Sequence, residues 1–275
     1  MKKLNKIKSF LLRILIVVFL GLFIYSAYQI IKYYLDNQSI NNQINNINKI
    51  TELKEVDNTN DQVIENNEEI SSSNPYWDYI NMNLINIDFN NLKNINNDIK
   101  GWIQVNGTNI NYPFVQASDN KYYLNHSLDK SSNSAGWVFL DYRNDLSNLD
   151  DKNTIIYAHG RLDKTMFGTL KDILTKKWLN NSDNHIVKLS NEYENTLWQV
   201  FSIYRIPTTS DYIRNYFKDD DDYKDFINTI VNRSSYHFNT TVSTSDRILT
   251  LSTCYNDTDK VVLHAKLIKR QIKNT

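Results

Sequence analysis

Residues 248–267 read ILTLSTCYNDTDKVVLHAKL, and this stretch decides how the rest of the chain is interpreted. Its first seven residues are mostly apolar or β-branched, which predicts a buried strand ending at Cys254. The polar turn YNDTDK follows, and VVLHAKL then predicts a second strand. Cys254 therefore lies where a strand passes into a loop, a position that often carries functional residues. We predict that Cys254 is a nucleophile; the alternative is a thiol that packs as a small hydrophobic group.

The composition indicates a folded domain with additional segments. Of the 275 residues, 41% are hydrophobic and 12% are aromatic, which is sufficient for a core. Lys and Arg total 31, as do Asp and Glu, and no basic stripe is interleaved with aromatic residues, so we expect no nucleic-acid partner. A single cysteine cannot form an internal disulfide, and the scattered histidines lack the spacing of metal ligands. We expect neither a metal nor another cofactor.

The N-terminal part predicts a membrane anchor. Residues 14–31 read ILIVVFLGLFIYSAYQII, without a charge. Five basic residues precede this run: Lys2, Lys3, Lys6, Lys8 and Arg13. Such a run spans a bilayer as a helix, and its basic flank stays in the cytoplasm. We expect residues 1–31 to be a cytoplasmic tail and a single transmembrane anchor in the cell membrane, with the remainder extracellular; the alternative is a cleaved signal peptide, whose apolar region is shorter.

Two further regions follow the predicted anchor. Residues 32–74 are rich in Asn, Asp, Glu and Ser, and we interpret them as an extracellular stalk or linker, partly a weakly amphipathic helix and partly disordered. Residues 75–275 are expected to form the folded domain. It begins with one or two short helices over residues 76–97, where apolar residues recur at helical spacing.

From residue 101 onward the sequence becomes strand-like. Strand patterns occur in GWIQV, NYPFVQ, WVFLD, NTIIYAHG, HIVKLS and NTLWQVFSIYRI, and the first two are joined by a hairpin turn at Asn106 and Gly107. Helices are expected over residues 166–178 and 221–231. Seven or eight strands with few helices indicate a mainly β fold, a mostly antiparallel barrel or sandwich.

A thiol becomes an effective nucleophile when a base lies beside it. His159 ends the strand TIIYAHG just as Cys254 ends ILTLSTC, so two strands of one sheet would bring the two side chains together. His185 and His237 lie in polar segments, and His264, in the middle of a strand, is expected to point outward. The remaining candidate, His126, follows YYLN in a short helix or turn. The alternative for each histidine alone is a solvated or packed imidazole.

An acyl-transfer site also needs a group that stabilises the developing oxyanion. Lys260 begins the strand after Cys254, so its charge is expected near the thiol across the YNDTD turn. The alternative is an ordinary solvated lysine at the start of a strand.

Several of these strings resemble the sortases, membrane-anchored cysteine transpeptidases of Gram-positive bacteria, and class B above all. The resemblance covers residues 76–270. It rests on five strings in order: GWIQVNGTNINYPFVQASDNKYYLNH, AGWVFLDYRN, IIYAHG followed by MFGTL, the helical segment 212–233, and TLSTC followed by VVLHAKL. It implies a closed β-barrel of seven or eight strands, with N-terminal helices and a helix inserted before the cysteine strand.

The resemblance also implies catalytic roles. Cys254 would attack the carbonyl after threonine in a sorting signal, forming a thioacyl-enzyme. His159 would protonate the leaving amine and deprotonate the incoming one. Lys260 stands where the family has an arginine, and it offers positive charge without the planar fork of a guanidinium. Either Lys260 substitutes for that arginine, or another arginine reaches in, with Arg161 and Arg247 as lesser candidates, or the protein is catalytically impaired.

Partners follow from the same resemblance. Asn120 and Leu124 match positions that line the class B peptide groove, and Tyr157, Ser252 and Thr253 lie beside the catalytic pair. The substrates would be surface proteins with a C-terminal sorting signal, and the acceptor would be the amine of a peptidoglycan precursor or a pilin lysine. The alternatives are a hydrolytic cysteine peptidase of the same fold, or a catalytically impaired, membrane-anchored binding module.

Overall fold

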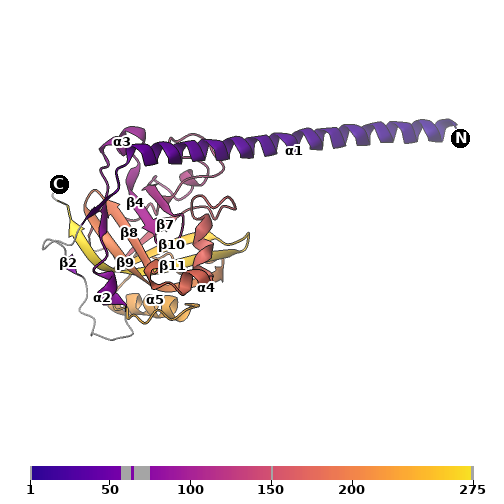
Figure 1. Ribbon diagram of the computed structural model, residues 1–275. Coiled ribbons are helices and arrows are strands. Elements are labelled where there is room, and N and C mark those ends of the chain that lie inside the picture. Colours follow the sequence, from indigo (N-terminus) through magenta and orange to yellow (C-terminus); the bar gives the residue numbers. More distant parts are fainter. Residues whose placement is uncertain (1, 57–62, 65–74, 150, 274–275) are drawn as a thin grey trace. The chain divides into compact units, whose positions relative to one another are not determined.

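The computed structural model describes residues 2–56, 63–64, 75–149 and 151–273, and the chain divides into two compact units, Met1–Gln43 and Ile44–Thr275. The long helix α1 (Lys2–Ile50) contains the predicted anchor and continues into the predicted stalk (Figure 1). Among the described residues it is the one helix that is long and apolar enough to cross a membrane. The rest of the predicted stalk lies largely outside the described residues.

The second unit contains a closed barrel of eight strands (Figure 1). The barrel strands are β4 (Ile99–Val105), β5 (Asn111–Val115), β6 (Phe139–Leu140), β7 (Asn153–Tyr157), β8 (Ile186–Asn191), β9 (Glu194–Pro207), β10 (Ile248–Cys254) and β11 (Asp259–Ile272). Their order is β10-β7-β6-β5-β4-β8-β9-β11, and the pairing of β10 with β11 closes the barrel. The pairs β7–β10 and β5–β6 are parallel, and the other six are antiparallel. The predicted barrel is confirmed.

Short elements flank the barrel. Strand β2 (Val63–Ile64) pairs with β11, and β1 (Lys54–Val56) pairs with β3 (Leu84–Asn86) in a small separate sheet. The two short helices predicted before the barrel are α2 (Tyr76–Tyr79) and α3 (Asn90–Ile95). The 3₁₀ helices are η1 (Tyr122–Leu124), η2 (Gly168–Leu174) and η3 (Ser182–Asn184).

The β4–β5 hairpin and the segment 166–178 test two predictions made from the sequence. The hairpin between β4 and β5 turns at Asn106 and Gly107 as predicted, and the φ of +69° at Gly107 is one that glycine adopts without strain. The prediction of one helix over residues 166–178 is wrong. That segment contains η2 followed by a single α-helical turn, α4 (Lys176–Leu179), because Thr175 is extended and its hydroxyl accepts a hydrogen bond from the amide of Trp178, capping a new helix.

Helix α5 (Asp220–Asn232) is the helix predicted before the cysteine strand. The side chain of Asp219 accepts a hydrogen bond from the amide of Asp222 and caps its first turn. Its buried apolar face packs on Val262 of β11 and Ile248 of β10. That face comprises Tyr223, Phe226, Ile227 and Ile230, whose spacing is helical. Burying such side chains stabilises the fold by roughly 1.5–3 kcal/mol each, so α5 is firmly held on the outside of the barrel.

Helix α5 also explains why His264 points outward, as expected, and yet is not exposed to solvent. His264 points outward but is fully buried, because Phe226 of α5 covers that side of β11. Its ring nitrogens lie 2.8 Å from Tyr204 Oη and 2.9 Å from Thr250 Oγ1. Burial, together with the charge of Arg233, lowers the pKa of His264 to about 3, so the imidazole is neutral.

Candidate active site

The parallel pairing of β7 with β10 brings His159 and Cys254 to the same edge of the barrel. The last pair in register is Tyr157 with Ser252, and His159 and Cys254 each follow two residues later. Because parallel strands end at the same edge, the two side chains line one cleft. The strand ends therefore meet as the sequence predicted.

Two contacts hold this edge together beyond the last strand pair. The Thr253 hydroxyl donates a hydrogen bond of 2.8 Å to the carbonyl oxygen of Ala158. Gly160 lies so close to the carbonyl oxygen of Cys254 that a Cβ at position 160 would overlap with it. Glycine at this position therefore allows the loop that follows His159 to pack directly against the end of the cysteine strand.

Lys260 contacts the thiol directly. It is paired with Cys254 across the antiparallel β10–β11 ladder, and its Nζ lies 2.9 Å from Sγ. Both residues are half-buried at the cleft. An ammonium group at this distance from sulfur stabilises a thiolate, and water screens the attraction only in part because the pair is half-buried.

The other two basic residues considered for this role are bound elsewhere. Arg161 forms an ion pair of 2.7 Å with Asp163, and Arg247 forms one of 2.8 Å with Glu194. Of the three candidates, Lys260 is the one in contact with the thiol.

The imidazole of His159 is oriented by a main-chain carbonyl. Its Nε2 lies 2.7 Å from the oxygen of Leu124. A carbonyl oxygen only accepts hydrogen bonds, so Nε2 carries the proton in this contact, and in the neutral ring Nδ1 is the nitrogen that can take up another. Leu124 therefore contributes a backbone acceptor as well as a side chain to the cleft.

All eight site residues predicted from the sequence line one cleft of about 700 Å³. These are Asn120, Leu124, Tyr157, His159, Ser252, Thr253, Cys254 and Lys260. Seven further residues complete the lining: Phe139, Ala158, Thr208, Thr209, Ser210, Tyr212 and Ile213. Residues 208–213 form the wall that sequence reasoning missed, because the segment has no strand or helix periodicity. The hydroxyl groups of Tyr212 and Ser252 lie 2.9 Å apart, which joins this wall to the cysteine strand.

A buried carboxylate lies behind the cleft. Asp141 accepts hydrogen bonds of 2.9 Å from Asn120 Nδ2, 2.8 Å from Tyr157 Oη and 2.8 Å from Arg143 Nη2. Burial raises the pKa of Asp141, but these hydrogen bonds, led by that from Arg143, outweigh it and hold the pKa below its usual value. Burial and the charge of Asp141 raise the pKa of Tyr157, so this phenol keeps its proton and donates it.

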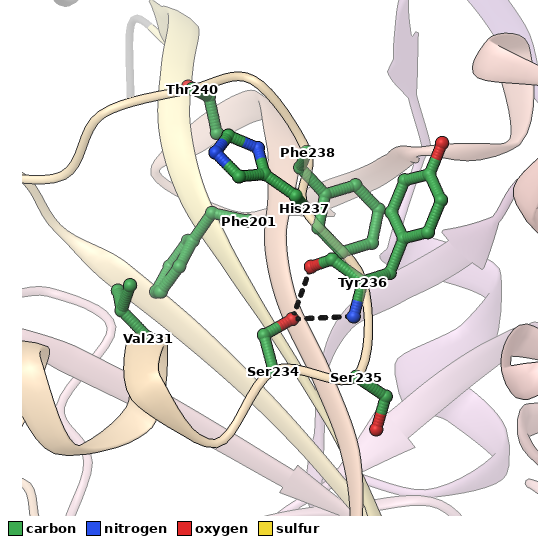
Figure 2. Close-up of a pocket in the computed structure, with 8 residues that line it drawn as sticks. All are labelled: Phe201, Val231, Ser234, Ser235, Tyr236, His237, Phe238 and Thr240. Carbon is green, nitrogen blue, oxygen red and sulfur yellow. Dashed lines mark hydrogen bonds between the residues drawn. The ribbon is translucent and has the colours of Figure 1, made fainter.

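The other four histidines are placed outside the cleft. His126 stacks on Tyr122 with ring centroids 4.0 Å apart, and His185 is buried against Trp178. His264 lies beneath α5. His237 lines a separate pocket of about 280 Å³ formed largely by the segment after α5 (Figure 2). His159 is therefore the histidine available to the thiol.

Metal-binding side chains do not cluster in the part of the chain that the structure describes. Among the described residues, no group of three or more His, Cys, Asp and Glu side chains could hold a metal ion. The cleft instead combines a thiol, an imidazole and an ammonium group. A nucleophilic thiol, an imidazole for proton transfer and a cationic group are the side chains that cysteine-dependent acyl transfer requires, and this cleft holds all three.

Comparisons with known proteins identify the family. Residues 103–268 match the family model of the sortase domain. The chain is 40% identical to sortase B of Staphylococcus aureus over 185 residues, 66% of this chain and 75% of that protein. It is 33% identical to sortase B of Listeria monocytogenes over 273 residues, 96% of this chain and 100% of that protein.

Solved structures agree with these relatives. The S. aureus sortase B–substrate complex matches with a TM-score of 0.61 and 39% identity, covering 66% of this chain and 84% of that one. A sortase B complexed with triglycine matches with a TM-score of 0.62 and 39% identity, covering 66% and 85%. The chain belongs to the sortase family, class B, and is a cysteine transpeptidase.

Proposed function

We propose that the protein cleaves a threonine-containing sorting signal of surface proteins and transfers the threonine carbonyl to an amine of the cell wall. The observation that carries this proposal is the contact of 2.9 Å between Lys260 Nζ and Cys254 Sγ in a cleft that His159 also lines. This contact supports a thiolate nucleophile with an acid–base group at hand.

In the first half-reaction, Cys254 Sγ attacks the threonine carbonyl and forms a carbon–sulfur bond. The peptide C–N bond breaks, and the leaving nitrogen takes a proton from the imidazolium of His159. In the second half-reaction, His159 accepts a proton from the incoming amine as its nitrogen attacks the thioester. The carbon–sulfur bond breaks, a new amide forms, and the thiolate returns beside Lys260.

The cationic group at position 260 has two tasks in this scheme. Its charge stabilises the thiolate before attack and the negative charge that develops on the substrate oxygen afterwards. A lysine ammonium can do both as a point charge, although it cannot form the two parallel hydrogen bonds of a guanidinium. The proposal therefore assigns Lys260 the role that the family gives to an arginine.

The substrate and acceptor are proposed from the cleft and from the relatives. One S. aureus sortase B structure is a substrate complex, and another sortase B structure contains triglycine. We assign the sorting peptide to the cleft beside Asn120, Leu124, Tyr157, Ser252 and Thr253. The acceptor is an amine, either of a peptidoglycan precursor or of a pilin lysine.

The proposed location is the outer face of the cell membrane. Residues 1–31 are the tail and anchor, residues 32–74 the stalk and residues 75–275 the catalytic domain. The apolar helix and its basic N-terminal flank support an N-terminus in the cytoplasm and a domain outside the cell.

The test uses the full chain in detergent micelles and a fluorogenic peptide library with one fixed threonine and randomised neighbours. Wild type is expected to cleave a subset after threonine and, with triglycine added, to yield the triglycine conjugate. Cys254→Ala is expected to form no thioester adduct by mass spectrometry, and His159→Ala to lose about a hundred- to ten-thousand-fold in turnover. Cleavage by Cys254→Ala at the wild-type rate would contradict the proposal.

Two other outcomes identify the alternatives. Products containing only the free acid, even with excess triglycine, would indicate a hydrolytic peptidase. A chain that cleaves no peptide and whose thiol reacts with a peptide-based electrophile no faster than free cysteine would indicate a binding module.

A further inference from the structure

Asp141 is a buried charged residue that touches the cleft from behind. It directly follows β6, its side chain is 0% exposed, and it does not line the cleft. Its two carboxylate oxygens accept hydrogen bonds from the side chains of Asn120, Tyr157 and Arg143. Two of these three donors line the cleft, so the carboxylate is connected to the surface that would meet a peptide.

These bonds fix how Asn120 presents its amide. Asn120 Nδ2 donates to Asp141, and Asn120 Oδ1 accepts a hydrogen bond of 3.0 Å from the backbone amide of Tyr142. A carboxylate only accepts and a backbone amide only donates, so the flipped orientation of the side chain would lose both bonds. One N–H of Asn120 remains for a peptide carbonyl.

The same carboxylate determines whether the Tyr157 hydroxyl donates or accepts a hydrogen bond with a substrate. The phenol proton is used in the bond to Asp141, so the Tyr157 oxygen can meet a substrate only as an acceptor. Asn120 as a donor and Tyr157 as an acceptor form a polar pattern that suits the alternating N–H and C=O groups of an extended peptide.

Arg143 extends this arrangement to the wall formed by residues 208–213. Its Nε and Nη2 bind Asp141 at 2.8 Å, and Nη2 also donates a bond of 2.9 Å to the carbonyl oxygen of Ile213. Ile213 belongs to the cleft wall formed by residues 208–213. The Asp141–Arg143 pair therefore joins this wall to Asn120 and Tyr157.

We propose that Asp141 is the positioning residue for peptide binding, orienting Asn120 and Tyr157 directly and the wall at Ile213 through Arg143. This inference rests on the proposed function. It assigns Asp141 to substrate affinity and not to the chemistry of the thiol, because none of its contacts involves Cys254, His159 or Lys260.

The test is Asp141→Asn in the full chain, assayed with the library peptide that wild type cleaves fastest. The new amide loses the charge that binds Arg143, and it adds a donor that competes with that of Asn120. We expect KM to rise about ten- to a hundred-fold, since hydrogen bonds to a buried charge are among the stronger ones, with kcat changed by less than about threefold. Alkylation of Cys254 by iodoacetamide is expected to keep its rate within about twofold.

Two further variants separate positioning from folding. Glu194→Gln removes another buried carboxylate bound to an arginine, at the start of β9 and outside the cleft; it is expected to lower thermal stability and leave KM unchanged. Arg143→Lys keeps the charge but cannot bind Asp141 and Ile213 with the same fork, so an intermediate KM is expected, and this variant replaces Asp141→Asn if the latter fails to fold.

Each outcome decides a different point. Wild-type KM in Asp141→Asn, or in Arg143→Lys where that variant replaces it, overturns the inference alone. Equal losses in kcat and in the alkylation rate also overturn it, because the thiol site would then be affected. A wild-type chain that cleaves no library peptide overturns the proposed function and this inference with it.

Discussion

Lys260→Met removes the ammonium group beside the thiol of Cys254 while keeping a side chain of similar length. With 2.9 Å between Nζ and Sγ, the attraction between ammonium and thiolate is about 1.4 kcal/mol at the dielectric constant of water and about 6 kcal/mol at an effective value of about 20. Both groups are half-buried, which places the effect between these limits. Since about 1.4 kcal/mol corresponds to a tenfold change, we expect the rate of Cys254 alkylation by iodoacetamide at pH 7 to fall about ten- to a thousand-fold.

The assay compares alkylation with peptide cleavage in the same preparations. Equal losses in both would mean that Lys260 acts on the thiolate alone, and a larger loss in cleavage measures its effect on the oxyanion. The control is Lys152→Met, because Lys152 is also half-buried but precedes β7 and donates to the Thr244 carbonyl at the opposite end of the strands from Cys254. If Lys260→Met is alkylated and cleaves peptide at wild-type rates, the reasoning is refuted and Lys260 is an ordinary solvated lysine.

Two remaining predictions concern packing and pH. Gly160→Ala is expected to lower the free energy of unfolding by about 1–3 kcal/mol and to slow Cys254 alkylation, because the new Cβ overlaps with the Cys254 carbonyl oxygen. The control is Gly21→Ala, whose Cβ would meet nothing within 4 Å. An unchanged melting temperature in Gly160→Ala would contradict the prediction. The pKa of His264 is lowered from 6.5 to about 3, so the folded state favours the neutral imidazole. The stability of the fold that depends on neutral His264 is therefore fully present above pH 6.5 and is lost as the pH falls toward 3. We expect a loss of about 2 kcal/mol between pH 6.5 and 5 by urea unfolding, and a smaller loss in His264→Gln; equal pH dependence in both proteins would exclude this cause.

The mainly β fold and the placement of the thiol and imidazole at strand ends could be predicted because they depend on local patterns. The closed barrel was expected from the resemblance to sortases, since the strand patterns alone left a barrel or a sandwich open. Cys254 and His159 each end an apolar run, and strands of one sheet that run in parallel must end at the same edge. The inserted helix α5 was predicted for the same reason, since its apolar residues recur at helical spacing. Each of these inferences used a periodicity that is complete within about a dozen residues.

Other features depend on contacts between distant segments. Asp141 is 21 residues from Asn120 and 16 from Tyr157, and no pattern in the sequence shows that the three side chains meet. The wall over residues 208–213 has no periodicity at all. The alternation of side chains along the strand predicted that His264 points outward. It could not predict that His264 is buried, because α5, from a different part of the chain, covers that side of the strand.

The contact between Lys260 and the thiol follows from the short turn that joins β10 to β11. Cys254 and Lys260 are directly opposed in the β10–β11 ladder, and opposed residues have Cβ atoms about 4.5–5.5 Å apart on the same face. At that separation the ammonium of a lysine reaches the sulfur, as the distance of 2.9 Å shows. A guanidinium offers a wider, planar set of donors that suits two acceptors, whereas an ammonium is a compact charge. This chain therefore separates two properties that an arginine combines: it keeps the positive charge next to the thiol and lacks the fork.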